Sequence, residues 1–316
     1  MVLVALALTG LGVSSIRDTI QRAGPAASPP AASPPAASPS ATRPAPPTPG
    51  TPRPTPSSSR PTSGGPTPSQ RPKNGPMPAP EDEDDADAAT LRSTFYRARP
   101  AGTMRCADAD PSRMSAKQRR AWAKTTVSTC LMAYWSPAFT KATGYTLPTP
   151  KLVLIDGRTV KTPCGSTTSS SNEAFFCAGN DTIYLWSRNM ANDNPRIATT
   201  YFVLAHEFGH HLQWAAGILA GSRGLRAIHP DRETQLSRRT ELQASCLGGR
   251  FLGAIGSSLS RFDRSGFPGN VVTGDRPGSR RTHGNVTNNR YWMGAGYRST
   301  SVSACNTFTA SAKRVA

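Results

Sequence analysis

The chain has 316 residues, and its 37 Lys and Arg against 19 Asp and Glu give a formal net charge of +18. Residues 24–80 hold 20 of the 30 prolines, and a segment of that composition cannot bury a core. The length alone permits two domains, but the composition leaves room for only one. No basic stretch is interleaved with aromatic residues, so we expect no specific nucleic-acid partner.

The N-terminus is apolar. Residues 2–16 are too short for a typical membrane helix but have the length of a signal-peptide core. We interpret residues 1–20 as a hydrophobic signal or membrane-anchor segment, with a buried N-terminal helix as the alternative. This predicts an extracytoplasmic protein that is either membrane-anchored or secreted.

A disordered linker rich in Pro, Ala, Ser and Thr is predicted over residues 21–88, and the acidic run Glu81–Asp87 marks its end. Residues 89–316 then form the folded domain. The charges before residue 88 cancel, so the domain carries the whole net positive charge. In an exported protein this favours contact with anionic cell-envelope polymers or lipids, although a solvated basic surface without a ligand is equally compatible.

Regular elements can be placed in the first part of the domain. Ser115–Trp135 reads as a helix that Ser115 caps and that ends before Pro137. Residues 151–156 and 181–186 read as strands, joined by a loop that holds Cys164 and Cys177.

The motif His206-Glu207-Phe208-Gly209-His210 follows, inside an apolar helical run. Positions four apart lie on one face of a helix, so both imidazoles can reach one metal ion. This HExxH pattern is typical of zinc hydrolases, in which zinc activates a water molecule and the glutamate acts as the general base. We therefore predict His206 and His210 as zinc ligands and Glu207 as the catalytic base. A chance match with two ordinary buried histidines is the alternative.

A third protein ligand is needed. The best candidate is Glu241, on a second helix-compatible run 31 residues after His210. Glu233 is its one serious competitor. The alternative for Glu241 is a solvated carboxylate paired with Arg238 or Arg239.

These motifs resemble those of the bacterial neutral zinc metallopeptidases, whose pattern runs His-Glu-x-Gly-His-His and then Glu-Leu-Gln-Ala-Asp-Cys. Further similar stretches are Thr162–Gly165, Phe176-Cys177, Ile183–Leu185, His283-Gly284 and Cys305–Phe308. The resemblance implies one zinc ion on His206, His210 and Glu241, with Glu207 as the base. It also places His283 in a matched motif, and we assign it as the donor to the tetrahedral oxyanion. A structural histidine in a Gly-rich loop is the alternative.

Three positions depart from the family pattern. Ser245 stands where the family has an aspartate that orients a ligand histidine, and Asn285 and Asn289 stand where it has Ser/Thr and Arg. Loss of such a partner typically costs about 10 to 100-fold in metal affinity or activity. We expect Ser245 to supply a weaker hydrogen bond and the enzyme to be active but weaker or narrower in range.

All six cysteines fall in the domain, and none forms a CxxC pair. We predict the disulfides Cys106–Cys130, Cys164–Cys177 and Cys246–Cys305, which agrees with export. Buried free thiols in a cytoplasmic protein are the alternative.

Together these features predict an α+β fold with a single zincin-like metallopeptidase domain. The predicted function is an exported or membrane-tethered zinc endopeptidase that acts on protein or peptide substrates. The resemblance puts residues 181–186 at a sheet edge that receives the substrate as an extra strand, although an interior strand fits the composition equally well. The alternative function is a catalytically impaired zinc domain that binds anionic envelope components. A zinc amidase acting on a smaller substrate is a third possibility.

Overall fold

The computed structural model describes residues 71–316 apart from 170–172, 189, 191–196, 270, 272–273 and 276–280. The expected signal or anchor segment, and most of the expected linker, lie outside the described residues. Among the described residues, no helix combines the length and the apolar character needed to cross a membrane.

The described chain begins with a segment that packs on the domain. The Lys73 amide donates to the carbonyl of Gly144, and the Met77 amide donates to that of Ala215. Helix α2 (Glu83–Leu91) follows, and the side chain of Asp82 caps it by accepting from the amide of Asp85. Three residues of the acidic run that we placed at the end of the linker, Glu83, Asp84 and Asp85, therefore form the first turn of a helix, where negative side chains interact favourably with the helix dipole. This helix packs on α6 (Ile218–Ile228).

The predicted helix after Ser115 is present, but it runs further than expected. It consists of α3 (Ala116–Thr125), a π-helical segment η3 (Thr126–Leu131) and α4 (Met132–Thr143). The expectation that it ends before Pro137 is wrong, because Pro137 lies inside α4 and the helix ends at Gly144 with φ 76°. Burial of Trp135 and Phe139 on either side of the proline offsets the missing hydrogen bond.

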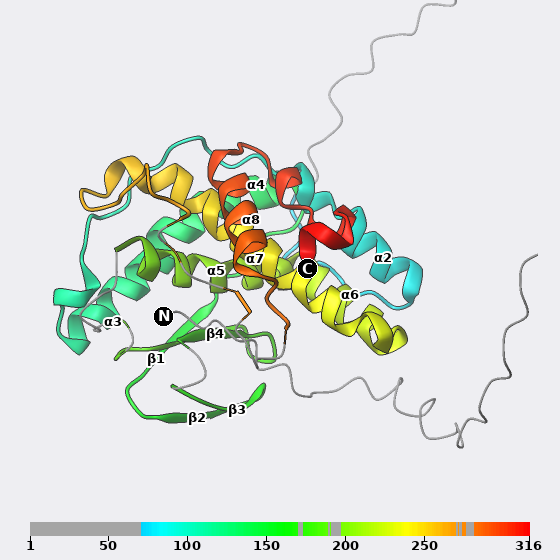
Figure 1. The fold of residues 1–316 in the computed structure, drawn as a ribbon, viewed down its shortest axis with the longest axis horizontal. Coiled ribbons are helices and arrows are strands. Elements are labelled where there is room, and N and C mark those ends of the chain that lie inside the picture. The colour runs from blue at the N-terminus through cyan, green and yellow to red at the C-terminus, as the bar shows by residue number, and fades with distance from the viewer. Residues whose placement is uncertain are drawn as a thin grey trace, which may run out of the picture. The chain divides into compact units, whose positions relative to one another are not determined.

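A small mixed sheet lies on one side of the helices (Figure 1). Its strand order is β1 (Lys151–Ile155), β5 (Thr182–Trp186), β4 (Ala174–Cys177), with β1 parallel and β4 antiparallel to β5. Both predicted strands are thus found, but β5 is the central strand and not an edge. Every residue of β5 is buried, as is typical of a strand covered on both faces. The two outer strands are β1 and β4.

The expected loop between the two predicted strands contains further structure. A separate hairpin of β2 (Thr159–Thr162) and β3 (Gly165–Thr168) precedes β4. The disulfide Cys164–Cys177 ties the turn of this hairpin to the end of β4.

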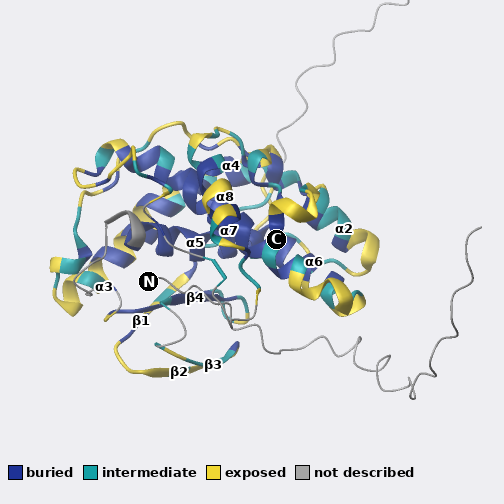
Figure 2. Cartoon of the chain, viewed as in Figure 1, coloured by how far each residue is buried: buried dark blue, intermediate teal, exposed yellow. Residues whose placement is uncertain are grey.

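Three long helices form the centre of the domain. Helix α5 (Ile197–Ala215) contacts β4 and β5 on one side and α7 (Glu233–Ile255) on the other, and α8 (Val286–Arg298) packs on α7. Figure 2 shows α5 and α7 largely buried beneath the more exposed outer helices. The shorter 3-10 turns are η1 (Thr94–Arg97), η2 (Pro111–Arg113), η5 (Pro230–Arg232), η6 (Gly256–Ser258), η7 (Val302–Cys305), η8 (Thr307–Thr309) and η9 (Ala312–Val315).

The six cysteines form the three predicted disulfides. Cys106–Cys130 fastens the segment before α3 to the π-helical segment, and Cys246–Cys305 ties α7 to the C-terminal region. No cysteine is free. The fold is therefore a mixed α and β domain with its buried centre along α5 and α7.

Candidate metal centre

Helix α5 carries the two histidines on one face. His206 and His210 lie one turn apart, and their Nε2 atoms approach to 3.1 Å. Both side chains are fully buried. The apolar residues around them on α5, including Phe202 and Phe208, are buried in the core and hold the helix in place.

Helix α7 brings Glu241 to the same point. Its Oε2 atom lies 3.3 Å from His206 Nε2 and 3.4 Å from His210 Nε2. The two helices can approach this closely because residue 209 is a glycine, since a Cβ there would lie 3.0 Å from the carbonyl oxygen of Ala244. The competitor Glu233 is exposed on the first turn of α7.

The alternative partners considered for Glu241 are engaged elsewhere. Arg238 Nε donates to the carbonyl of Arg281 and lies 3.7 Å from Asp275. Arg239 donates to the carbonyls of Thr307 and Phe308. Glu241 is therefore not a solvated carboxylate in an arginine pair.

The three side chains suit a metal ion. One ligand atom from each of His206, His210 and Glu241 lies within 4.8 Å of the others, and all three residues are buried. Glu241 Oε2 makes no hydrogen bond of normal geometry to any described group, and leaving a buried carboxylate oxygen in that state is costly unless it has a cationic partner. Two imidazole nitrogens and one carboxylate oxygen are the donor set of a hydrolytic zinc site.

Glu207 lies beside this cluster on α5 and is completely buried. Neither of its carboxylate oxygens makes a hydrogen bond of normal geometry within the described chain. Burial raises its pKa to about 8, to which Glu241 contributes, while His210 and the nearby backbone of Phe176 act to lower it. In the metal-free site Glu207 therefore keeps its proton at neutral pH, and a bound cation would favour its ionised form.

The two histidines respond differently to the same carboxylate. Burial lowers the pKa of His206 to about 4, so this ring is neutral at physiological pH. Burial also acts to lower the pKa of His210, but Glu241 and Glu207 outweigh it and the pKa is raised. Burial opposes ionisation of Glu241, yet His283, His210 and His206 together hold its pKa well below the usual value.

Each histidine has a hydrogen-bond partner on its other ring nitrogen. Gln213 Oε1 lies 2.8 Å from His210 Nδ1, and Gln213 Nε2 donates to the carbonyl of Thr240, which fixes the orientation of the amide. For His206 the partner is Ser245, whose Oγ lies 3.2 Å from Nδ1. The sequence pointed to Ser245 but not to Gln213, although its position three residues after His210 on the same helix was a usable signal.

His283 also reaches the cluster. Its Nε2 atom lies 3.5 Å from Glu241 Oε2, and 15% of the side chain is exposed. The loop before α8 is held by Asp275, which accepts from the His283 amide. His211 points elsewhere, with Nδ1 on Asp181 and Nε2 on the carbonyl of Pro148.

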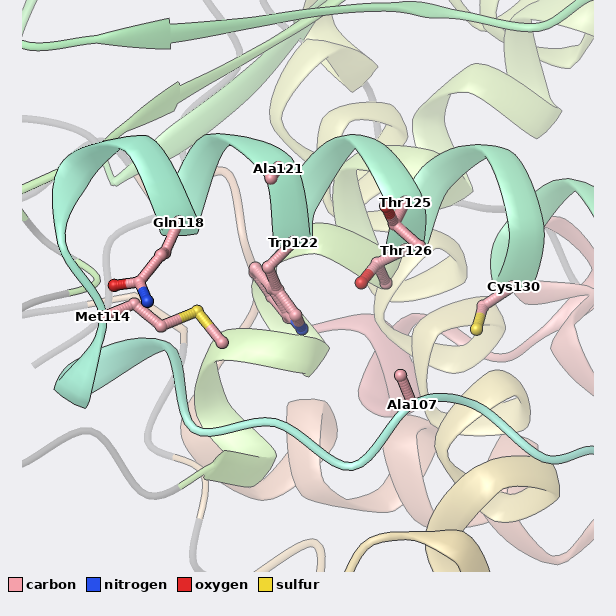
Figure 3. Close-up of a pocket in the computed structure, with 8 residues that line it drawn as sticks. All are labelled: Ala107, Met114, Gln118, Ala121, Trp122, Thr125, Thr126 and Cys130. Atoms are coloured by element: carbon pink, nitrogen blue, oxygen red, sulfur yellow. The ribbon is translucent and has the colours of Figure 1, made fainter.

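A separate hollow of about 300 Å³ runs along α3 (Figure 3). Met114, Trp122, Thr126 and Cys130 line it, with Ala107 on its far side. The three candidate ligands and Glu207 do not line this hollow.

Comparison with known proteins identifies the family. Residues 93–266 match the family described as "Putative neutral zinc metallopeptidase", so the chain belongs to this family. The match includes the cluster, Glu207 and Ser245, and ends before His283.

The matched relatives are named only as uncharacterized proteins. YpfJ of Escherichia coli K12 is 30% identical over 203 residues, which are 55% of this chain and 66% of YpfJ. Rv2575 of Mycobacterium tuberculosis is 27% identical over 214 residues, 56% of this chain and 67% of Rv2575. The aligned part thus spans about two thirds of each relative. No solved structure matches the chain.

Proposed function

We propose that this protein is a zinc-dependent endopeptidase that holds one zinc ion on His206, His210 and Glu241. The observation that carries the proposal is the convergence of two Nε2 atoms and one carboxylate oxygen in a buried site. Beside them lies a buried carboxylate, Glu207, with no hydrogen bond of normal geometry to the described chain. Family membership supports the same reaction class.

When bound, zinc would supply Lewis-acid activation of a water molecule at neutral pH. Glu207 then takes the proton of the attacking water and passes it to the departing amine. His283 Nε2 has no hydrogen bond to the described chain, so it is free to donate to the oxyanion that develops on the substrate carbonyl. His206 and His210 would act as neutral ligands.

The substrate class follows from the strand beside Glu207. Strand β4 pairs with β5 on one side and is the last strand of its sheet among the described residues. Its residue Phe176 has its backbone beside the Glu207 carboxylate. A peptide in extended conformation that adds to β4 would present its carbonyl groups to the metal. The residues of β4 are buried, so this pairing requires the part of the protein that covers the strand to move. This favours a protein or peptide substrate over a small amide, and assigns to β4 the role that the sequence suggested for residues 181–186.

We also propose an extracytoplasmic location. Three disulfides in one domain of this size are typical of an oxidising compartment. The strongly basic domain would favour anionic envelope polymers or lipids as neighbours. Anchoring by residues 1–20 remains part of this proposal and is tested by fractionation of the full chain, since a soluble cytoplasmic product would contradict both secretion and anchoring.

The alternative of an impaired zinc domain depended on Ser245. In the structure the Ser245 hydroxyl contacts His206, so the substitution keeps a partner for this ligand. This supports the enzyme over the impaired domain.

The full chain provides a direct test. We expect wild type to cleave an unstructured protein such as casein in a zinc-dependent manner, and Glu207→Gln to lose at least about 100-fold in rate while retaining zinc. The matched control is Glu233→Gln, an exposed glutamate on α7, which should leave activity unchanged. Equal cleavage by wild type and Glu207→Gln would refute the proposed function.

A further inference from the structure

Two buried polar residues connect the metal site to the loop that carries His283. Ser245 lies on α7 and Asn289 on α8, and each has 1% of its surface exposed. Ser245 Oγ lies 3.2 Å from His206 Nδ1 and donates to Asn289 Oδ1 at 3.1 Å. On its other side, Asn289 Nδ2 lies 2.7 Å from the carbonyl oxygen of His283.

The hydrogen bonds that link His206, Ser245 and Asn289 each have a fixed direction, which is set by the partners of Asn289. Asn289 Nδ2 donates to the carbonyls of His283, Gly284 and Asn285, which only accept. The amide therefore cannot turn over, and its Oδ1 atom must face Ser245. Since Oδ1 only accepts, the Ser245 hydroxyl must donate to it. The serine lone pairs then face His206 Nδ1, which must carry the proton.

We infer that Ser245 and Asn289 form a hydrogen-bond relay that fixes the proton of His206 on Nδ1 and so leaves the Nε2 lone pair free for a metal. The inference rests on the proposed zinc site and adds Asn289 as a positioning residue. Asn289 acts through Ser245 on one side and through the carbonyl of His283 on the other. It therefore ties the orientation of a metal ligand to the loop that places His283 beside Glu241.

The relay also explains two departures from the family pattern together. Ser245 and Asn289 were noted separately in the sequence, where the family has Asp and Arg, but in the structure they contact each other. Both residues of this pair are neutral. A carboxylate at 245 should be harmful, because it would face Asn289 Oδ1, and the three carbonyls keep this amide from turning over.

The test is zinc affinity of the full chain, measured by competition with a chelator. We expect Ser245→Ala and Asn289→Ala each to lose about 10 to 100-fold, the usual effect of removing such a partner. Their double variant should lose no more than Ser245→Ala alone, because the two act in series. Ser245→Asp should also lose at least about tenfold. The matched control is Asn288→Ala on the same helix, whose amide donates to Lys313 and Ala316 and which should bind zinc as wild type does.

A second readout does not depend on zinc. Nitrogen NMR of the zinc-free full chain, assigned by loss of the signal in His206→Ala, should show the proton of His206 on Nδ1 in wild type and a mixture of tautomers in Ser245→Ala. This variant removes one oxygen, so it reports on the relay even if Asn289→Ala fails to fold. The inference is overturned if wild type carries the proton on Nε2, if Ser245→Ala binds zinc as tightly as wild type, or if Ser245→Asp binds it more tightly. Failure of wild type to bind any zinc would instead refute the proposed function, and the tautomer measurement would still judge the relay.

Discussion

The approach of α7 to α8 is the most informative feature to perturb, because both helices carry residues of the site. Gly249 faces α8 at very short range: a Cβ there would lie 2.2 Å from the carbonyl oxygen of Met293. The same relation recurs at Gly253, where a Cβ would lie 2.2 Å from the carbonyl oxygen of Tyr297. These obstacles are backbone atoms, which cannot turn aside as a flexible side chain can.

We predict that Gly249→Ala destabilises the domain. Raising 2.2 Å to the 3.4 Å of ordinary contact requires α7 and α8 to separate by about 1 Å. Overpacking of a well-packed interior costs about 1–3 kcal/mol, and Tm changes by roughly 2–4 °C for each kcal/mol in a domain of this size. Separation of the helices also draws Asn289 away from Ser245, so zinc affinity should fall as well.

The control is Gly224→Ala in the interior of α6, where the nearest atom to an added Cβ is the Ala86 Cβ at 3.9 Å. Alanine is the better helix former, so this variant should gain about 0.5–1 kcal/mol. The assay is thermal unfolding of the zinc-free proteins, followed by circular dichroism. Equal stability of Gly249→Ala and Gly224→Ala would contradict the close packing of α7 on α8.

Three further predictions concern the site and its frame. Because the pKa of Glu207 rises from 4.5 to about 8 on folding, this carboxyl group should lower the stability of zinc-free wild type as pH rises from 4.5. Glu207→Gln lacks this ionisable group, so its free energy of unfolding in urea, relative to wild type, should increase by about 3 kcal/mol between pH 4.5 and 7. A difference between the two proteins that does not change with pH would contradict a raised pKa for Glu207. Replacing Cys246 and Cys305 by Ala opens a loop with a sequence separation of 59 and should cost about 4 kcal/mol in the same assay, and an unchanged midpoint would show that this bond does not stabilise the fold. His283→Ala should lower kcat about 100-fold or more with little change in KM, whereas full turnover would refute its role as oxyanion donor.

Local spacing explains why the candidate ligands lie close together, while their roles stay predictions. His206 and His210 are four apart on a helix, and this interval alone sets their common face. The ligand candidate Glu241 also lies where the sequence suggested, because the helix α7 that carries it returns along α5. The three disulfide pairs were predicted from their positions along the chain and agree with the structure.

Features that depend on distant contacts were harder to predict. Pro137 reads as a helix end because it lacks an amide hydrogen, but the burial of Trp135 and Phe139 keeps the helix intact. Edge and interior strands cannot be separated by alternation when a strand is apolar throughout, so β5 was open to either reading. The contact of Ser245 with Asn289 joins two helices, and no local pattern in either one indicates it.

The central claim is that His206, His210 and Glu241 bind one zinc ion. The most direct measurement is the zinc content per full-length chain, by mass spectrometry of the metal after dialysis, for wild type, Glu241→Ala and the exposed control Glu233→Ala. The proposed site predicts about one zinc per chain in wild type and in Glu233→Ala, and almost none in Glu241→Ala. Equal zinc content in Glu241→Ala and wild type would contradict it.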